Sequence, residues 1–406
     1  ADGTIRRLVP FHYDEIHEIC EGIKVRFTDV GHLLGSASIE LWLTEGNVTK
    51  KLVFSGDIGN KKHTLIRDPQ YIKEADYVIM ESTYGDRYHT QERPDYVMEL
   101  AKVIRGAFEK GGNVVIPSFA VGRTQEMLYY IREIKAQNLL PEFANFPVYV
   151  DSPLAVEATG VFQKNIAGCF SEEAKALVSQ GINPLTFPNL HLSITSDESK
   201  MINFDDEPKV IISASGMCEA GRIRHHLKHN LWRPQCTVVF VGYQAVGTLG
   251  RTLLEGATDV KLFGEPVEIR AEICKLDGIS GHADKDGLIQ WVTDIDSPKK
   301  VFVVHGEDEV CESFAKCLRE EHGLDAQAPY SGDCFDLING VWAEQVAPVY
   351  AKKKEKAKKR KDEVFERLLA AGQRLLSVIR RNEGGANKDL AKFADQINML
   401  SDKWDR

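Results

Sequence analysis

The stretch GHLLGSA at residues 31–37 lies between two runs, 23–28 and 38–43, in which apolar and polar residues alternate. Such alternation is typical of half-buried β-strands, because successive side chains point to opposite faces of a sheet. The stretch is therefore a glycine-rich loop at a strand end, where a histidine is well placed to bind a metal. Taken alone, His32 is more often an ordinary polar loop residue, so the hypothesis needs further residues of the same kind.

Two acidic residues occupy equivalent positions further along the chain. Asp57 follows the apolar run 52–54 and Glu81 follows the run 77–80. Continuous apolar runs indicate strands that are buried on both faces. Alone, Asp57 would be a turn residue and Glu81 part of a helix N-terminus, so each gains weight only from the others.

Two histidines complete the set near the end of the globular part. His282 lies within ISGHAD at 279–284, and His305 follows the apolar run 301–304. Sheet folds gather strand ends along one edge, which is where binding sites form. These residues therefore indicate a single site, and His with Asp is a ligand set that suits a hard or borderline metal.

The middle of the chain alternates strand and helix patterns. Apolar runs that predict strands lie at 114–116, 148–150, 210–212 and 238–241, and helical patterns lie at 95–109 and 124–137. A strand–helix–strand rhythm predicts a parallel sheet, because parallel neighbours need a crossover connection. A chain of 406 residues is long enough for two cores and a tail.

The composition changes after residue 349. Residues 352–361 are mostly Lys and Arg, a run that either contacts RNA or forms a solvated helix face. Two amphipathic patterns on either side of Gly384 and Gly385 then predict a helical hairpin. The apolar stripe of its second helix consists of Leu390, Phe393, Ile397, Leu400 and Trp404. We expect this stripe to pack onto the core or to form a homodimer, because it is unfavourable in water.

Bulk properties limit the classes of function. A net charge of −9 argues against a protein that coats nucleic acid non-specifically, although a local basic groove stays open. No apolar run is long enough to span a bilayer and no signal-peptide pattern is found, so we expect a cytoplasmic protein without a membrane partner. The 8 cysteines form no CxxC pair, which favours reduced thiols and argues against a cysteine-based zinc site.

In this order, the motifs resemble the metallo-β-lactamase superfamily and, within it, the β-CASP branch of RNA-processing nucleases. GHLLGSA and the SGD at 55–57 resemble the third and fourth metal motifs. ESTYG at 81–85, GHAD at 281–284 and VHGE at 304–307 resemble motifs A, B and C of the branch. PSFAVGRTQE at 117–126 and SASGM at 213–217 are also typical of it.

The resemblance implies a fold and its division into domains. We expect an α/β protein with a metallo-β-lactamase αββα sandwich, an inserted β-CASP domain with a parallel sheet, and a basic helical tail. The sandwich would be discontinuous, formed by residues 1–85 and 271–348. The β-CASP domain would span 86–270 and the tail 349–406.

The resemblance also implies a role for each site residue. In the complete family site two zinc ions share a bridging Asp, so His32 would bind one ion, Asp57 would bridge, and His305 would bind the other. His282 would contact the scissile phosphate and protonate the leaving oxygen. Glu81 would accept a hydrogen bond that orients a neighbouring histidine.

Substrate contacts are implied in the inserted domain. Arg123 lies at a predicted helix N-terminus, where backbone N–H groups and a guanidinium favour phosphate. Ser213, Ser215 and Gly216 lie at a strand end and would donate to phosphate oxygens. Motif C is His in the RNA enzymes of the branch and apolar in the DNA-repair enzymes, so His305 favours single-stranded RNA as substrate.

One departure from the family pattern affects the metals. Family members carry a His-x-His-x-Asp-His signature upstream of the third metal motif, and this chain has none. We expect the segment that bears it to be missing from this chain, so that metal is bound weakly or not at all. A non-catalytic RNA-binding protein and a hydrolase of small esters or thioesters stay open as alternatives, although a long inserted domain argues against the second. Endonuclease and 5′-exonuclease action are not distinguished.

Overall fold

The fold was analysed in a computed structural model of the chain. It describes residues 2–61, 63–89, 94–276, 278–347 and, in the C-terminal part, 368–404 except 370 and 373. Two compact units are present, residues 1–346 and 347–406, and each is described by itself.

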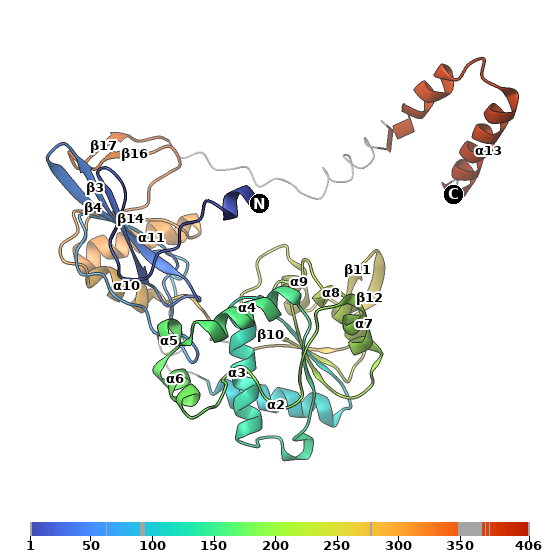
Figure 1. The fold of residues 1–406 in the computed structure, drawn as a ribbon, viewed down its shortest axis with the longest axis horizontal. Coiled ribbons are helices and arrows are strands. Elements are labelled where there is room, and N and C mark those ends of the chain that lie inside the picture. Colours follow the sequence, from blue (N-terminus) through green and yellow to red (C-terminus); the bar gives the residue numbers. More distant parts are fainter. Residues whose placement is uncertain are drawn as a thin grey trace. The chain divides into compact units, whose positions relative to one another are not determined.

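The first sheet of the larger unit combines strands from two distant parts of the chain (Figure 1). Its strands, in spatial order, are β1 (His17–Cys20), β2 (Ile23–Asp29), β3 (Ala37–Glu45), β4 (Val48–Phe54), β5 (Tyr77–Met80), β14 (Lys300–Val303) and β15 (Ala326–Gln327). Neighbours from β1 to β4 are antiparallel, whereas β4, β5, β14 and β15 run parallel. The C-terminal ends of β2, β4, β5 and β14 therefore lie at the same edge of the sheet.

Helices cover one face of this sheet. The core there joins strand residues such as Val78 and Val303 to Trp291 of α10 (Lys285–Thr293) and Phe314 of α11 (Asp308–His322). Trp291 and Phe314 are fully buried. These helices form because their apolar residues recur at helical spacing, and Asp284 caps α10 by accepting from the Gly287 N–H at 3.0 Å.

The opposite face carries a β-hairpin. β16 (Cys334–Asp336) and β17 (Val341–Glu344) place Phe335 and Trp342 against Tyr77 and Phe302 of the sheet. The Tyr77 hydroxyl donates to the carbonyl of Leu337 at 2.8 Å. This two-stranded hairpin forms a β layer on the face of the sheet opposite α10 and α11.

The second sheet is parallel throughout, as the sequence predicts. Its strands, in spatial order, are β13 (Glu272–Lys275), β10 (Thr237–Phe240), β6 (Val114–Pro117), β9 (Val210–Ser213), β7 (Val148–Val150) and β8 (Leu190–Leu192). Every residue of β6, β9 and β10 is buried, because helices cover both faces. The whole of β13 lies beyond residue 270, the predicted end of the inserted domain, so the second sheet extends past that predicted boundary.

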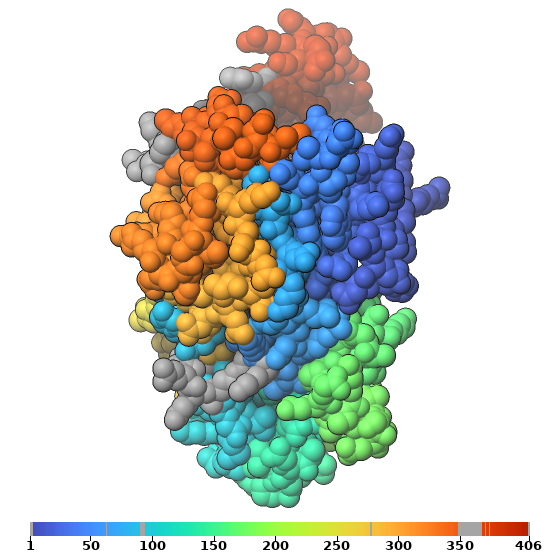
Figure 2. All heavy atoms as spheres, turned by 90° about the vertical axis from the view of Figure 1, so that its left-hand side faces the viewer, coloured from blue at the N-terminus to red at the C-terminus, as the bar shows by residue number. Residues whose placement is uncertain are grey.

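The helices of the second sheet fall into two groups. One core includes residues of α2 (Tyr96–Glu109), α3 (Arg123–Ala136), α4 (Pro153–Lys164), α5 (Ile166–Cys169) and α6 (Glu172–Ser179). The other core includes residues of α7 (Ser196–Phe204), α8 (Ile223–Asn230) and α9 (Leu249–Leu254), with the small hairpin β11 (Asp259–Leu262) and β12 (Glu265–Glu268). In space-filling view, the two sequence-distant parts of the first sheet lie side by side above the second (Figure 2).

The smaller unit is helical where it is described. Helical turns between residues 368 and 381 precede Gly384, and α13 (Asn387–Trp404) follows it. The side chains of Leu400 and Trp404 are exposed. Packing of this stripe against the core or a second copy stays a prediction, and residues 352–361 lie outside the described part. None of the described helices is long and apolar enough to cross a membrane.

Candidate metal centre and substrate cleft

The predicted site residues lie in loops at one edge of the first sheet. His32, Asp57, Glu81 and His305 follow β2, β4, β5 and β14, in that order, and His282 precedes α10. The loops are packed tightly on one another. A Cβ on Gly59 would lie 2.0 Å from the carbonyl oxygen of Gly31, so only glycine allows these two loops to meet.

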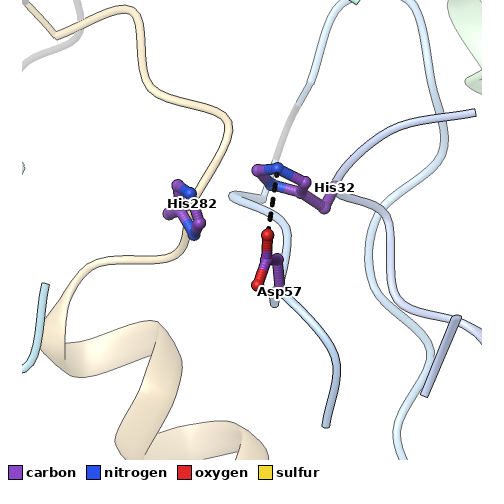
Figure 3. Close-up of side chains that lie close together, drawn as sticks. All are labelled: His32, Asp57 and His282. Carbon is purple, nitrogen blue, oxygen red and sulfur yellow. Dashed lines mark ion pairs between the residues drawn. The ribbon is translucent and has the colours of Figure 1, made fainter. Parts of the chain in front are cut away.

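Three of these side chains converge closely (Figure 3). His32, Asp57 and His282 each offer one donor atom, and these atoms all lie within 4.8 Å of one another. Nε2 of His32 lies 3.9 Å from a carboxylate oxygen of Asp57, and the His32 and His282 ring centroids are 4.3 Å apart. The sequence assigned His282 to phosphate rather than metal, so its place among the metal donors is a new feature of the structure.

His305 reaches the same carboxylate from the other side. Its Nε2 lies 3.3 Å from Oδ1 of Asp57, while Oδ2 faces His32. Asp57 thus stands between the two histidines that the sequence assigned to separate metal ions. The His305 backbone has φ of 51°, and its carbonyl accepts from the Ser82 N–H at 3.2 Å.

Glu81 is buried and holds His282 in place. Its carboxylate lies 3.1 Å from Nδ1 of His282 and also accepts from the Ile58 N–H at 2.5 Å and the Thr83 N–H at 3.2 Å. Burial alone would raise the pKa of Glu81, but these hydrogen bonds bring it below its usual value. Burial likewise opposes protonation of His282, yet the Glu81 carboxylate raises the pKa of His282 above its ordinary range.

His32 is shifted in the opposite direction. Burial, together with the nearby His282, lowers the pKa of His32. A neutral imidazole is the form that binds metal, since a protonated nitrogen has no lone pair to offer. The pKa values of the two adjacent histidines are thus shifted in opposite directions, which favours the neutral, metal-binding form for His32 and the protonated form for His282.

A cavity of about 530 Å³ opens beside the two histidines. It is lined at one end by His32 and His282 and elsewhere by residues of the second sheet, among them Phe119, Arg123 and Tyr243. The catalytic edge of one sheet therefore faces a cleft whose far wall belongs to the other. The sequence did not single out the two aromatic rings, although Phe119 lies within the quoted stretch 117–126.

Two family models and several known proteins are similar to this chain in sequence. The chain matches the family model of the Beta-Casp domain over residues 124–253. It also matches the Zn-dependent metallo-hydrolase RNA specificity domain over residues 266–329. It is 37% identical to a ribonuclease of Thermus thermophilus over 78% of this chain and 70% of that protein.

Two archaeal proteins are similar over comparable lengths. An RNase J-like protein of Methanocaldococcus jannaschii is 36% identical over 80% of this chain and 74% of its own length. The transcription termination factor FttA of Methanosarcina mazei is 31% identical over 80% of this chain. The chain spans only 51% of the length of that factor.

This chain belongs to the β-CASP family of metallo-β-lactamase-type RNA-processing nucleases.

In this β-CASP nuclease, the residues predicted to bind substrate are mostly engaged within the fold. Arg123 forms an ion pair with Glu126 and donates to the Ile279 carbonyl at 3.1 Å. The buried Ser213 hydroxyl donates to the Asp151 carbonyl at 2.8 Å. The single hydroxyl hydrogen of Ser213 is therefore already used, whereas Arg123 has further N–H groups beyond these two contacts, and its phosphate contact stays a prediction. An i,i+3 Arg–Glu pair is readable in the sequence and could have indicated the ion pair of Arg123.

Ser215 and Gly216 directly precede Met217, which lines the cleft. The Ser215 hydroxyl is half-buried and donates to the Ala220 carbonyl at 3.2 Å. Gly216 is buried, and its carbonyl accepts from the Gln244 amide at 2.9 Å. Gly216 therefore supports other residues of the cleft wall, and its contact with substrate stays a prediction.

The sequence did not predict a buried polar network in the β-CASP domain. Asp151 follows β7 and is fully buried. Its carboxylate accepts from Arg222 at 2.7 Å, from Nε2 of His226 at 2.7 Å and from Ser199 at 2.5 Å. Because Arg222 directly precedes α8, the network fixes the start of that helix behind the cleft wall.

Proposed function

We propose that this β-CASP nuclease is a zinc-dependent phosphodiester hydrolase that cleaves single-stranded RNA. The observation that carries the proposal is the convergence of His32, Asp57 and His282 at one end of the cleft. The ribonuclease names of the relatives support the same reaction. Because the chain spans only part of each relative, the activity of this chain itself belongs to the proposal.

The donor set fits zinc. An imidazole and a carboxylate are common zinc ligands, which bind at about 2.0–2.2 Å, so donors about 3–4 Å apart can share one ion. The 3.9 Å between His32 and Asp57 and the 3.3 Å between His305 and Asp57 meet this condition. We propose two zinc ions in the complete family site, which His32, Asp57 and His305 would help to hold. An ion needs at least three protein ligands, so we expect the chain without the His-x-His-x-Asp-His ligands to hold metal weakly.

Zinc bound there would supply Lewis-acid polarisation of a phosphate oxygen and activation of the attacking water. The protein itself supplies a proton. Nδ1 of His282 faces Glu81, so the remaining ring nitrogen, Nε2, is free to protonate the leaving oxygen. The Glu81 carboxylate raises the pKa of His282, which favours the protonated ring. Glu81 is a positioning residue, because it holds the ring without contacting the substrate.

The cysteines and the cleft bear on where the protein works and on what it binds. The 8 cysteines are all free, which fits a reducing compartment, and we propose a cytoplasmic location. Single-stranded RNA is the proposed partner, because the cleft lies beside the donors and a duplex would hide its bases.

The test compares RNA cleavage, with and without added zinc, by the chain joined to a segment that supplies the His-x-His-x-Asp-His ligands it lacks. We would test the wild type, His282→Ala and the control His12→Ala, whose side chain is exposed. Each would be incubated with single-stranded RNA, double-stranded RNA and single-stranded DNA of one sequence. We expect zinc-dependent cleavage of the single-stranded RNA by the wild type and the control only. Binding of RNA without cleavage would favour the non-catalytic alternative. Hydrolysis of a small ester but not of RNA would favour a hydrolase of small esters or thioesters.

A further inference from the structure

Two aromatic rings are left exposed in the cleft. Phe119 follows β6 and is 44% exposed, and Tyr243 follows β10 and is 49% exposed. Both line the cavity that contains His32 and His282. Large apolar groups that stay exposed in a cavity mark a binding surface, since burying them in the core would stabilise the fold.

The Phe119 ring is held in place by its contact with Gly216. A Cβ on Gly216 would lie 2.9 Å from Cδ2 and 3.0 Å from Cε2 of Phe119. The ring therefore packs directly on the backbone, with no space for a methyl group between them. One side of the ring is covered by Gly216, and the exposed remainder faces the cleft.

The loop of Tyr243 is fastened to the same glycine. The buried Gln244 side chain donates to the Gly216 carbonyl at 2.9 Å and to the Gly242 carbonyl at 3.3 Å. The loops that bear the two rings are thus tied to one backbone residue. A surface built in this way is preorganised, so little order is lost when a ligand binds.

The chemistry of this wall favours a flat, uncharged ligand group over phosphate. Leu154 and Met217 also line the cavity. Among the described residues of its lining, Arg123 is the one Lys or Arg, and it is paired with Glu126. The reacting phosphate belongs at the opposite end, beside His32 and His282.

We propose that Phe119 and Tyr243 form a stacking platform for unpaired nucleobases of the RNA strand next to the scissile phosphate. The inference rests on the proposed function and adds to it the means of selecting single strands. Every base has a π-face, so a stacking platform accepts any sequence, whereas a duplex covers those faces.

The test measures binding of short single-stranded RNAs to the metal-free chain, which prevents cleavage. One oligonucleotide carries 2-aminopurine, whose fluorescence falls on stacking, at successive positions near the cleavage site. A second lacks the base at the position that responds. The variants are Phe119→Ala, Tyr243→Ala, Phe119→Trp and the control Val246→Ala, which is 83% exposed in the same loop as Tyr243 and does not line the cavity.

We expect Phe119→Ala and Tyr243→Ala each to weaken binding of the intact RNA by about 5- to 100-fold. The same variants should bind the RNA without that base as the wild type does, because the missing base has no ring to stack. Phe119→Trp should retain binding and quenching, and Val246→Ala should match the wild type.

Equal losses for intact and base-free RNA would overturn the inference, since Phe119 would then only shape the loop. Wild-type affinity in both alanine variants would also overturn it while leaving the proposed nuclease intact. Failure of the wild type to bind either RNA would reject the proposed function and the platform together.

Discussion

His282 lies where two sets of contacts meet on one imidazole. Nδ1 faces the buried Glu81 carboxylate, and the ring also stands among the donors formed by His32 and Asp57. Changing His282 therefore separates two roles, that of a proton donor and that of a metal ligand. We expect His282→Ala to lower RNA cleavage by about 10²- to 10⁴-fold, the typical contribution of a positioned acid.

The metal content of the variants distinguishes the roles. In the chain joined to the missing His-x-His-x-Asp-His segment, elemental analysis after zinc loading and dialysis should find nearly unchanged zinc in His282→Ala. Asp57→Ala should lose zinc and cleavage together, because its carboxylate lies between His32 and His305. Loss of zinc from His282→Ala would show that the histidine is a ligand and that its assignment as the acid is wrong.

Asp151 is the second residue whose environment gives a quantitative expectation. Burial raises its pKa, but the hydrogen bonds from His226, Ser199 and Arg222 outweigh burial and lower the pKa. Removing one partner of a buried ionic network leaves the others unpaired. We expect Asp151→Asn to reduce the free energy of unfolding by about 3 kcal/mol in urea titrations at neutral pH.

The difference between wild type and Asp151→Asn should depend on pH. A lowered pKa means that the carboxylate contributes its full stability above its unfolded-state pKa of about 4. That contribution is lost as the pH falls through the lower pKa of the folded protein. The two unfolding curves should therefore converge in acid, and a gap that stays constant down to pH about 2 would contradict the network as the cause.

At the scale of elements, the β16–β17 hairpin depends on a few aromatic contacts. Trp342 packs against Phe302 and Phe335, and its Nε1 donates to Gln327 at 3.2 Å. We expect Trp342→Ala to lower the free energy of unfolding by about 2 kcal/mol, less than for a fully buried ring. The matched control is Val341→Ala, whose side chain is 55% exposed. Equal destabilisation by both variants would show that the hairpin does not stabilise the sheet through Trp342.

Elements were more predictable from sequence than contacts. Continuous apolar runs identified β6, β9 and β10, because a strand that is buried on both faces has mostly apolar side chains. Strand-end positions identified His32 and Asp57. The seat of Phe119 on Gly216 could not be predicted, since it depends on how two loops pack. The Asp151–His226 contact likewise joins residues far apart in the chain.

At the scale of the whole molecule, the larger unit has cores of its own and the smaller unit exposes an apolar stripe. We expect a chain ending at Val346 to unfold cooperatively. Compared with the full chain, the chain without residues 347–406 should differ in melting temperature or in oligomeric state measured by light scattering. The reason is that the stripe needs a partner surface. If both quantities stay unchanged, the stripe packs on neither the core nor a second copy.

The pairing of β5 with β14 has a consequence for how the chain is made. Met80 lies opposite Val303 in this parallel pair, and the whole second sheet lies between them in sequence. During synthesis on the ribosome, the strands up to β5 emerge first. The edge of β5 that pairs with β14 then stays unpaired until residue 303 has been synthesised. Folding of the inserted sheet in the meantime brings the two ends together and shortens the effective loop. The nascent chain is thus most prone to aggregation in that interval, and slow translation of residues 94–276 would prolong it.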